Sequence, residues 1–304
     1  METTDFKEWD SFGKIENYEN LEEYFENLHT NFKKDEKTKY YSHYTSLSNI
    51  ENIFSSGEIW ISSTNEFNDN EEENELKNKY FSLCFCRGKG ENLALWYLYS
   101  GTQGTGGRMI FTQAKLRKIL NEPIMYLCKK EEKRKHGIPL ILNKDYTLDF
   151  GNVLYYKKNY NHVDLKFNTM TNFHKIPYSE FEKYQKKHLG FTKNIIWYHE
   201  NEMRVFITLS DEMMARFNQE KKEVIKIDIS QIADAIKIQL APEIADKDFV
   251  RKYPNISAIL DENQNRVILS DYKGAIKMKL CDKCEYKCDE IKCSKRTNKE
   301  NDKK

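Results

Sequence analysis

Residues 80–86 (YFSLCFC) form a dense apolar run without a charged side chain. The run has the length of a strand and lacks the spacing of an amphipathic helix, so we expect a buried strand here. Other short runs rich in aromatic and β-branched residues recur along the chain and predict further strands. They are KYYSHYTS, EIWIS, RMIFT, DFGNVLYYKK, KKEVIKIDIS and the longer NIIWYHENEMRVFITL at residues 194–209, which we expect to be one strand, straight or bulged.

Short helices are predicted between these strands. The stretch SLSNIENIFSSG has an apolar face, a serine cap and Gly57 as its end. Helices are also predicted at ENLALWYLYS, TQAKLRKIL, YSEFEKYQKKHLGF and DKDFVRKYP, and a helix turning into a strand at SQIADAIKIQLAPEI. No internal repeat accompanies these elements. The pattern predicts an α+β fold with a mainly antiparallel sheet and flanking helices.

Composition divides the 304 residues into three segments. Residues 1–39 are rich in Glu, Asn and Lys and contain one stretch of helical spacing, which predicts a helical leader. Residues 40–280 hold the predicted strands and most of the aromatic side chains, so we expect the catalytic or binding domain there. Residues 281–304 are basic and cysteine-rich, and we expect a small C-terminal tail that ends in a loose segment.

Charge and hydropathy exclude several classes of protein. The formal net charge is +1, which argues against strong overall attraction to nucleic acid or to an anionic membrane. No apolar run is long enough to span a bilayer, and the start METTDFKEWD lacks the layout of a signal peptide. We therefore expect a cytoplasmic protein without a membrane partner. In a reducing compartment the scattered Cys84, Cys86 and Cys128 are most simply buried thiols.

The tail contains a cysteine cluster with the spacing C-x2-C-x3-C-x4-C, made of Cys281, Cys284, Cys288 and Cys293. Four thiolates within this span are able to close a tetrahedral zinc site. Interleaved lysines would suit contacts with phosphates. The alternative is a basic tail that carries unliganded thiols, and the spacing leaves both interpretations open.

Two groups of polar residues in the domain are candidates for a site. His43 lies on a predicted strand, where a lone histidine is more often a structural hydrogen-bonding residue than a ligand-binding one. Glu200, Glu202 and Arg204 alternate along another predicted strand and therefore share a face. They form either a solvent-facing strip or, if that face is buried, a group of perturbed carboxylates of the kind found at functional sites.

A glycine-rich stretch, GTQGTGG, follows the aromatic helix at ENLALWYLYS. Its spacing matches neither a Walker A loop nor a dinucleotide-binding fingerprint. We favour a flexible connection between a helix and a strand over a phosphate-binding loop.

Three stretches together resemble the bacterial DUF2971 family. They are YSHYTSLSNIENIFSSGEIWISSTNEFND, SLCFC with NLALWYLYSGTQGTGGRMIF, and WYHENEMRVF, in that order across residues 40–209. The chain departs from the family pattern at Asn70, where proline is common, and at Leu98, where histidine is common. The layout also resembles ADP-ribosyltransferase-like domains, which implies a core of that kind.

This resemblance implies roles for particular residues. His43 would hydrogen-bond the ribose on the nicotinamide side of NAD, supported by Thr45. Glu200 or Glu202 would bind a ribose hydroxyl and stabilise the developing oxocarbenium ion. Tyr97 or Tyr99 would stack on the nicotinamide ring. The remaining NAD-binding candidates are Tyr44, Trp96 and Arg204.

Three hypotheses of function follow. The first is an NAD-dependent ADP-ribosyltransferase or NAD glycohydrolase, a bacterial toxin or an antiviral (phage-defence) effector, with NAD as substrate and a protein or nucleic acid as acceptor. The second is a non-enzymatic module that binds nucleic acid or protein through the zinc-knuckle-like tail. The third is a degenerate fold used only for protein contacts. A bound zinc with salt-sensitive nucleic-acid binding would favour the second hypothesis.

Overall fold

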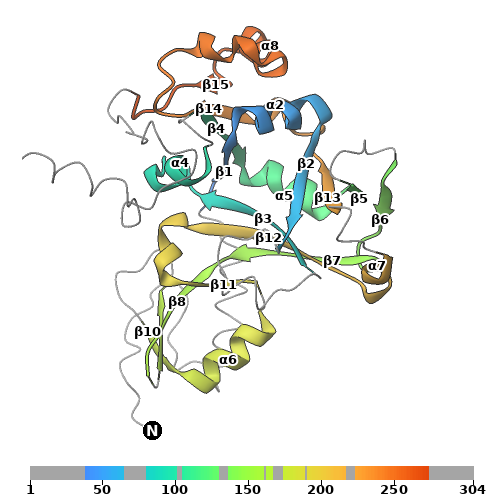
Figure 1. Cartoon of the computed structure of the whole chain (residues 1–304), viewed down its shortest axis with the longest axis vertical. Helices are drawn as coiled ribbons and strands as arrows, with labels where there is room; N and C mark the ends of the chain where they lie inside the picture. Colours follow the sequence, from blue (N-terminus) through green and yellow to red (C-terminus); the bar gives the residue numbers. More distant parts are fainter. Residues whose placement is uncertain are drawn as a thin grey trace, which may run out of the picture.

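The computed structural model of the chain describes residues 38–64, 80–100, 105–129, 136–160, 162–166, 174–188, 190–216 and 223–273. Within these residues the fold is α+β, with a mainly antiparallel sheet and flanking helices, as the sequence predicts (Figure 1). The leader at residues 1–39, apart from its last two residues, lies outside the described residues. So does the cysteine-rich tail at residues 281–304.

An eleven-stranded sheet forms the centre of the molecule. Its main order is β15-β14-β4-β1-β3-β2-β13-β5-β6, and β12 pairs with both β3 and β7. Its pairs are antiparallel except β14 with β15. The strands are β1 (Tyr40–Ser46), β2 (Glu58–Ser63), β3 (Tyr80–Arg87), β4 (Gly106–Thr112), β5 (Met125–Lys129), β6 (Ile138–Leu140), β7 (Tyr146–Asn152), β12 (Glu202–Leu209), β13 (Glu223–Asp228), β14 (Lys237–Leu240) and β15 (Val267–Ile268).

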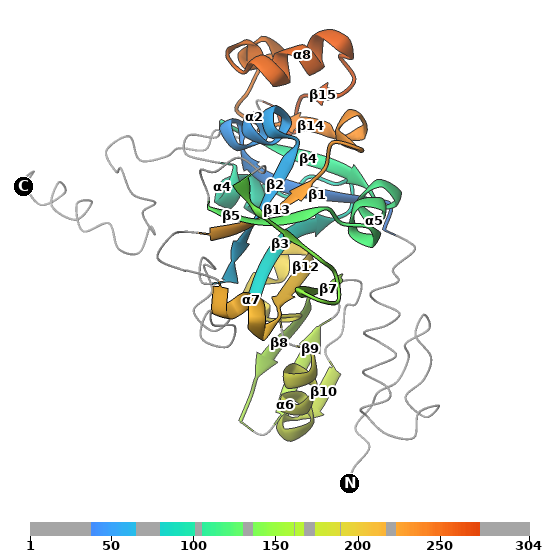
Figure 2. The ribbon, with the colours of Figure 1, turned by 90° about the vertical axis from the view of Figure 1, so that its right-hand side faces the viewer.

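A second sheet of four strands lies at one end of the molecule with helix α6 (Tyr178–Lys187) (Figure 2). Its order is β10-β9-β8-β11, with a parallel pair between β8 and β11. The strands are β8 (Leu154–Lys158), β9 (His162–Lys166), β10 (His174–Pro177) and β11 (Thr192–Asn194). Only Val153 separates β7 from β8, so the two sheets are continuous along the chain.

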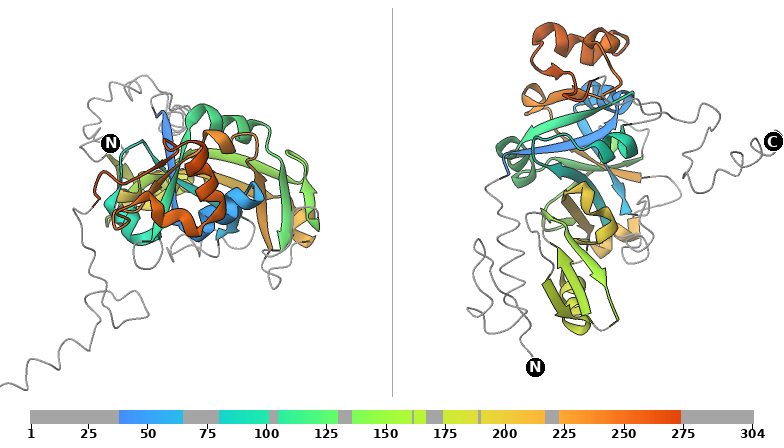
Figure 3. Two further views of the ribbon diagram at one scale, coloured as in Figure 1. Left: turned by 90° about the horizontal axis from the view of Figure 1, so that it is seen from above. Right: turned by 90° about the vertical axis from the view of Figure 1, so that its left-hand side faces the viewer.

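The remaining helices cover the large sheet. Helix α8 lies at the end of the molecule opposite the small sheet, next to α2 (Figures 1 and 3). The short 3₁₀ helices η5, η7 and η8 connect strands and helices. The bounds are α2 (Leu47–Ser56), α4 (Leu93–Tyr99), α5 (Gln113–Asn121), α7 (Asp211–Arg216), α8 (Pro254–Glu262), η5 (Ile195–Glu200), η7 (Ala233–Ala235) and η8 (Lys247–Lys252). Among the described residues, no helix has the length and apolar character needed to cross a bilayer.

Helix α2 follows its sequence signals closely. The hydroxyl of Ser46 accepts a hydrogen bond from the backbone of Asn49, and Gly57 ends the helix in the left-handed region at φ 70°. Leu47 and Ile50 are fully buried against the sheet. They lie so close to Gly107 of β4 that an added Cβ there would approach the Cδ1 atom of Ile50 to 2.8 Å. The glycine therefore allows α2 to sit directly on β4.

Gly107 belongs to strand β4 and not to the flexible connection predicted for GTQGTGG. Gly106 and Gly107 begin β4, so the predicted flexible connection is wrong at its last two glycines. A Cβ on Gly106 would lie 1.9 Å from the carbonyl oxygen of Ser100. The two glycines thus serve close packing, which is an alternative reason for glycine in a strand.

The predicted single strand at residues 194–209 is also wrong. The chain leaves β11 at Asn194, turns through η5, and enters β12 at Glu202. Asn194 caps η5 by accepting from the backbone of Ile196, and Asn201 ends it at φ 45°, a left-handed conformation that asparagine tolerates. The predicted helix at DKDFVRKYP is the 3₁₀ helix η8, and the longer α8 that follows it was not predicted.

Candidate functional site

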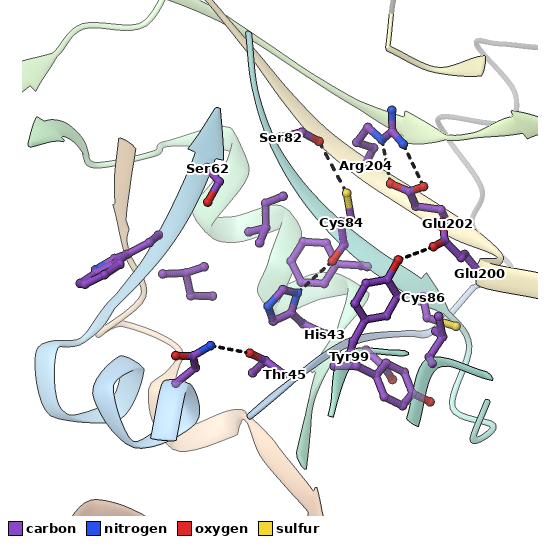
Figure 4. A pocket seen from close by; sticks show the side chains of 18 of the residues that line it. His43, Thr45, Ser62, Ser82, Cys84, Cys86, Tyr99, Glu200, Glu202 and Arg204 are labelled. Atoms are coloured by element: carbon purple, nitrogen blue, oxygen red, sulfur yellow. Dashed lines mark hydrogen bonds and ion pairs between the residues drawn. The ribbon is translucent and has the colours of Figure 1, made fainter. Parts of the chain in front are cut away.

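One cavity of about 640 Å³ lies beside β3 in the large sheet (Figure 4). Its size is within the usual range for small-molecule sites. The walls come from β1, α2, β2, β3 and α4, and from the segment around η5 that joins the two sheets. Segments far apart in the sequence therefore meet around one space.

The cavity exists because two strands share one edge of β3. Strand β2 pairs with the first half of β3 at Ser82, and β1 pairs with its second half at Cys86. Between these points neither strand pairs with Cys84, although β12 pairs along the opposite edge. The divergence of β1 and β2 leaves the middle of β3 facing the cavity.

His43 lies at this divergence. Its Nδ1 donates to the carbonyl oxygen of Cys84 at 2.9 Å, so the neutral ring presents Nε2 as an acceptor. Its ring meets Phe85 edge to face, with ring centroids 5.9 Å apart. Burial lowers the pKa of His43 below 6.5, an effect that the Cys84 carbonyl partly offsets. The imidazole is therefore neutral at physiological pH.

Glu200 forms the centre of the opposite wall. Its Oε1 accepts from the hydroxyl of Tyr99 at 2.6 Å, and its Oε2 accepts from Nζ of Lys193 at 2.7 Å. The residue is only 5% exposed. Glu200 ends η5 and is not on a strand, so the alternation argument that placed it beside Glu202 was wrong, although the two side chains do lie together. Lys193 joins them because its Nζ is also 3.5 Å from Oε2 of Glu202.

Glu202 and Arg204 form a bidentate pair on one face of β12, as the alternation of that strand predicts. Nε of Arg204 donates to Oε1 at 2.7 Å and Nη2 donates to Oε2 at 2.9 Å. Burial raises the pKa of Glu202, but the charges of Arg204 and Lys193 outweigh that effect and lower the pKa to about 2. Nη1 of Arg204 donates to the carbonyl of Gly190 at 2.6 Å, which fixes the guanidinium. Glu202 is thus ionised and held.

The aromatic candidates separate into two groups. Tyr99 and Tyr44 line the cavity. The hydroxyl of Tyr44 accepts from the backbone of Asn92 at 3.0 Å and from Arg108 at 3.1 Å, and burial raises its pKa to about 12. The Tyr44 hydroxyl is therefore occupied by hydrogen bonds within the protein, while Tyr99 contacts the acidic wall, the part of the lining formed by Glu200, Glu202, Lys193 and Arg204.

Trp96 and Tyr97 do not line the cavity. Trp96 is fully buried, packs edge to face on Tyr44, and donates from Nε1 to Glu91 at 2.8 Å. Tyr97 is 54% exposed on the outer face of α4. The helical rotation from Tyr97 to Tyr99 explains the difference, because neighbouring positions of a helix point in different directions. Trp96 and Tyr97, which were predicted as NAD-binding residues, therefore lie outside the lining of this cavity.

Thr45 and Leu98 also line the cavity. The hydroxyl of Thr45 accepts from Nδ2 of Asn49 at 2.9 Å. Leu98 places an alkyl side chain in the lining, so this position contributes no titratable group to the cavity.

Lys193 was not predicted as a site residue. Its sequence context offers little signal, because it is one of 49 Lys and Arg residues in the chain. In the structure it is 4% exposed, and its Nζ lies 4.9 Å from the ring centroid of Trp197. A lysine between aromatic residues just before a predicted acidic pair is the feature that would have indicated it.

Metal binding was predicted only for the tail cysteines, which lie outside the described residues. Within the described part of the chain, no three His, Cys, Asp or Glu side chains are grouped so as to hold a metal ion. The titratable groups that line the cavity are one imidazole, two phenols, three carboxyl groups, two thiols, one lysine ammonium and one guanidinium.

The fold and the cavity define an α+β protein with a concave site that combines a neutral imidazole with a buried, charge-balanced acidic wall. Comparison with protein-family models, with curated proteins and with solved structures found no match.

Proposed function

We propose that the chain is an enzyme that binds NAD in this cavity and cleaves the bond between nicotinamide and ribose. The observation that carries this proposal is the meeting of His43, Tyr99 and Glu200 around one cavity, although β1, α4 and η5 are distant in the sequence. A histidine, a tyrosine and a glutamate are the residue types that the resemblance to ADP-ribosyltransferase-like domains implies for the site. We accordingly propose that the core of the domain is ADP-ribosyltransferase-like. The class is ADP-ribosyltransferase or NAD glycohydrolase.

The chemical step has a simple balance. The C1′–N1 bond of NAD breaks, its electron pair leaves with neutral nicotinamide, and the ribose becomes an oxocarbenium ion. A hydroxyl, amine or base nitrogen of an acceptor, or a water oxygen, then forms the new bond to C1′ and loses one proton. Both reactions need stabilisation of the positive charge on the ribose. Transfer to an acceptor also needs exclusion of water, which would otherwise compete with the acceptor.

The residues supply this stabilisation in different ways. Nε2 of His43 accepts a hydrogen bond from a ribose hydroxyl. The carboxylate of Glu200 lies against the ribose and stabilises the oxocarbenium ion, and the ring of Tyr99 provides an apolar wall for nicotinamide. Glu202 is occupied by Arg204 through both oxygens, so we assign it the role of holding Lys193 and the wall in place.

The test uses the purified full chain, NAD and chromatographic measurement of free nicotinamide. We expect His43→Ala and Glu200→Gln to lower kcat/KM by about 100-fold or more, because each removes a group that acts on the reacting ribose. The matched controls are His136→Ala and Glu212→Gln, two exposed residues outside the cavity lining, which keep wild-type rates. Circular dichroism and melting curves establish that all four variants are folded.

Two readings of the products separate transfer from hydrolysis. Free ADP-ribose in equal amount to nicotinamide indicates a glycohydrolase, and label retained on a protein or nucleic acid indicates a transferase. Absence of nicotinamide release with either kind of acceptor, together with absence of NAD binding in calorimetry, would overturn the proposal.

A further inference from the structure

Trp60 of β2 lines the same cavity, and β2 pairs with the opposite edge of β3 from β12, which carries Glu202 and Arg204. The side chain of this residue is 36% exposed, which is unusual for a large aromatic residue on a central strand. Figure 4 places His43 between Thr45 and Ser62 on one side and Tyr99 and Glu200 on the other. The cavity lining therefore continues past the imidazole on the side away from Glu200.

The Trp60 ring is held by its neighbours. Strand β13 pairs with β2 so that Lys226 is opposite Trp60, and Nζ of Lys226 lies 4.8 Å from the ring centroid. Lys226 is 3% exposed, and its Nζ lies 3.9 Å from Oε2 of the buried Glu58. An ammonium group held near the ring in this way restricts the motion of the indole.

Two exposed amides of α2 line the cavity together with Trp60. Nδ2 of Asn49 donates to Thr45, which leaves its carbonyl oxygen without a partner among the described residues. The side-chain amide of Asn52 has no hydrogen-bond partner in that part of the chain either. An aromatic face beside amide donors and acceptors suits a planar heteroaromatic base, which stacks through its face and hydrogen-bonds through its edge.

We propose that Trp60, Asn49 and Asn52 form a second subsite, which binds the adenine ring of NAD. The assignment of adenine rests on the proposed function, because NAD carries two planar rings at its two ends and the cavity is lined from both edges of β3, by β2 on one and β12 on the other. Nicotinamide lies at the acidic wall and adenine at Trp60, with the ribose-phosphate groups passing His43.

The test compares NAD with nicotinamide mononucleotide, which has the same scissile bond but lacks the adenylate half. We expect Trp60→Leu to lower kcat/KM for NAD by about 10-fold and to leave cleavage of nicotinamide mononucleotide unchanged, because stacking on an aromatic side chain contributes on this scale. Trp60→Phe keeps a ring and retains most of the rate with NAD. Tyr178→Leu is the matched control, since Tyr178 is similarly exposed at 38% and lies outside the cavity lining.

Adenosine monophosphate binding, measured by calorimetry on the same variants, makes the two proposals separable. Equal effects of Trp60→Leu on the two substrates, or none on either, overturn the subsite while leaving NAD cleavage intact. If wild type cleaves neither substrate, the proposed function fails. In that case Trp60-dependent binding of adenosine monophosphate still supports a base-binding subsite, and its absence overturns the subsite as well.

Discussion

Nδ1 of His43 is committed to the Cys84 carbonyl, and the ring is shielded from water on the Phe85 side. A protonated imidazole would place a buried positive charge in a cavity that Lys193 and Arg204 also line. Burial accordingly lowers the pKa of His43 below 6.5. The neutral ring is the form that accepts a hydrogen bond at Nε2.

This lowered pKa gives a pH prediction. A histidine whose pKa is lowered becomes protonated only at more acidic pH than usual, so the acid limb of kcat/KM for the proposed nicotinamide release should be centred below pH 6.5. The measurement is a pH profile of kcat/KM between pH 5 and pH 8, the range in which histidine commonly titrates. An acid limb centred above 6.5 would contradict the assignment of Nε2 as the acceptor.

For single residues, the sequence was enough to predict several members of the site, but not which side chains surround them. His43, Tyr99, Glu200, Glu202 and Arg204 were named as candidates, and all five line the cavity. Lys193 was missed because an isolated lysine in a lysine-rich chain carries no periodic signal. Burial of its ammonium depends on pairing with Glu200, which only the three-dimensional structure brings near it.

Among the secondary-structure elements, α8 depends on another helix for its N-terminal cap. Its N-cap residue, Tyr253, provides no side-chain hydrogen bond. Instead the carboxylate of Glu51 on α2 accepts from the backbone N–H groups of Asn255 and Ile256 at 2.9 and 3.0 Å, and from Nδ2 of Asn255 at 2.6 Å. A carboxylate at this position also interacts favourably with the helix dipole.

We therefore expect Glu51→Ala to lower the free energy of unfolding by about 1–2 kcal/mol, the usual cost of losing a helix cap. Glu51→Gln keeps an acceptor and should lose less. The measurement is urea unfolding at neutral pH, with the exposed Glu262→Ala at the other end of α8 as control. If Glu51→Ala and Glu262→Ala have equal effects, the tertiary cap contributes nothing.

Element prediction succeeded where the signals are local. Helix α2 has its cap, its apolar face and its glycine end within a single stretch, so its bounds could be read directly. Helix α8 has its cap from a distant residue, and the strand predicted at residues 194–209 is broken by the conformation of Asn201. Long-range capping and single left-handed residues leave little trace in local periodicity.

At the scale of the whole molecule, the acidic wall joins the two sheets. Lys193 belongs to β11 of the small sheet, while Glu202 and Arg204 belong to β12 of the large one. The hydroxyl of Tyr155 on β8 accepts from the backbone of Glu202 at 2.9 Å, which adds a second link. A movement of the small sheet would therefore displace Lys193 and leave the carboxylates of Glu200 and Glu202 with one cation fewer.

Removing Arg204 alone from the buried pair with Glu202 should lower the free energy of unfolding more than removing both side chains. We expect Arg204→Met to lower the free energy of unfolding by about 3 kcal/mol, because it leaves the buried Glu202 without its bidentate partner. The double variant Glu202→Met with Arg204→Met should recover much of that loss. The measurement is chemical denaturation at pH 7.

Arg251→Met is the control for this cycle, since Arg251 forms an exposed ion pair with Asp261 and its loss should change stability little. Additive losses in the double variant at Glu202 and Arg204 would show that the pair is not energetically coupled.

The separation of β1 from β2 along β3 has one more consequence, which concerns main chain and not side chains. In a strand the N–H and C=O of one residue point to the same side, so the amide of Cys84 faces the cavity together with the carbonyl that receives His43. A carboxamide oxygen that enters the cavity would meet this amide, and alanine scanning leaves the main chain intact. Replacing the Cys84 amide by a backbone ester is the change that would remove the N–H.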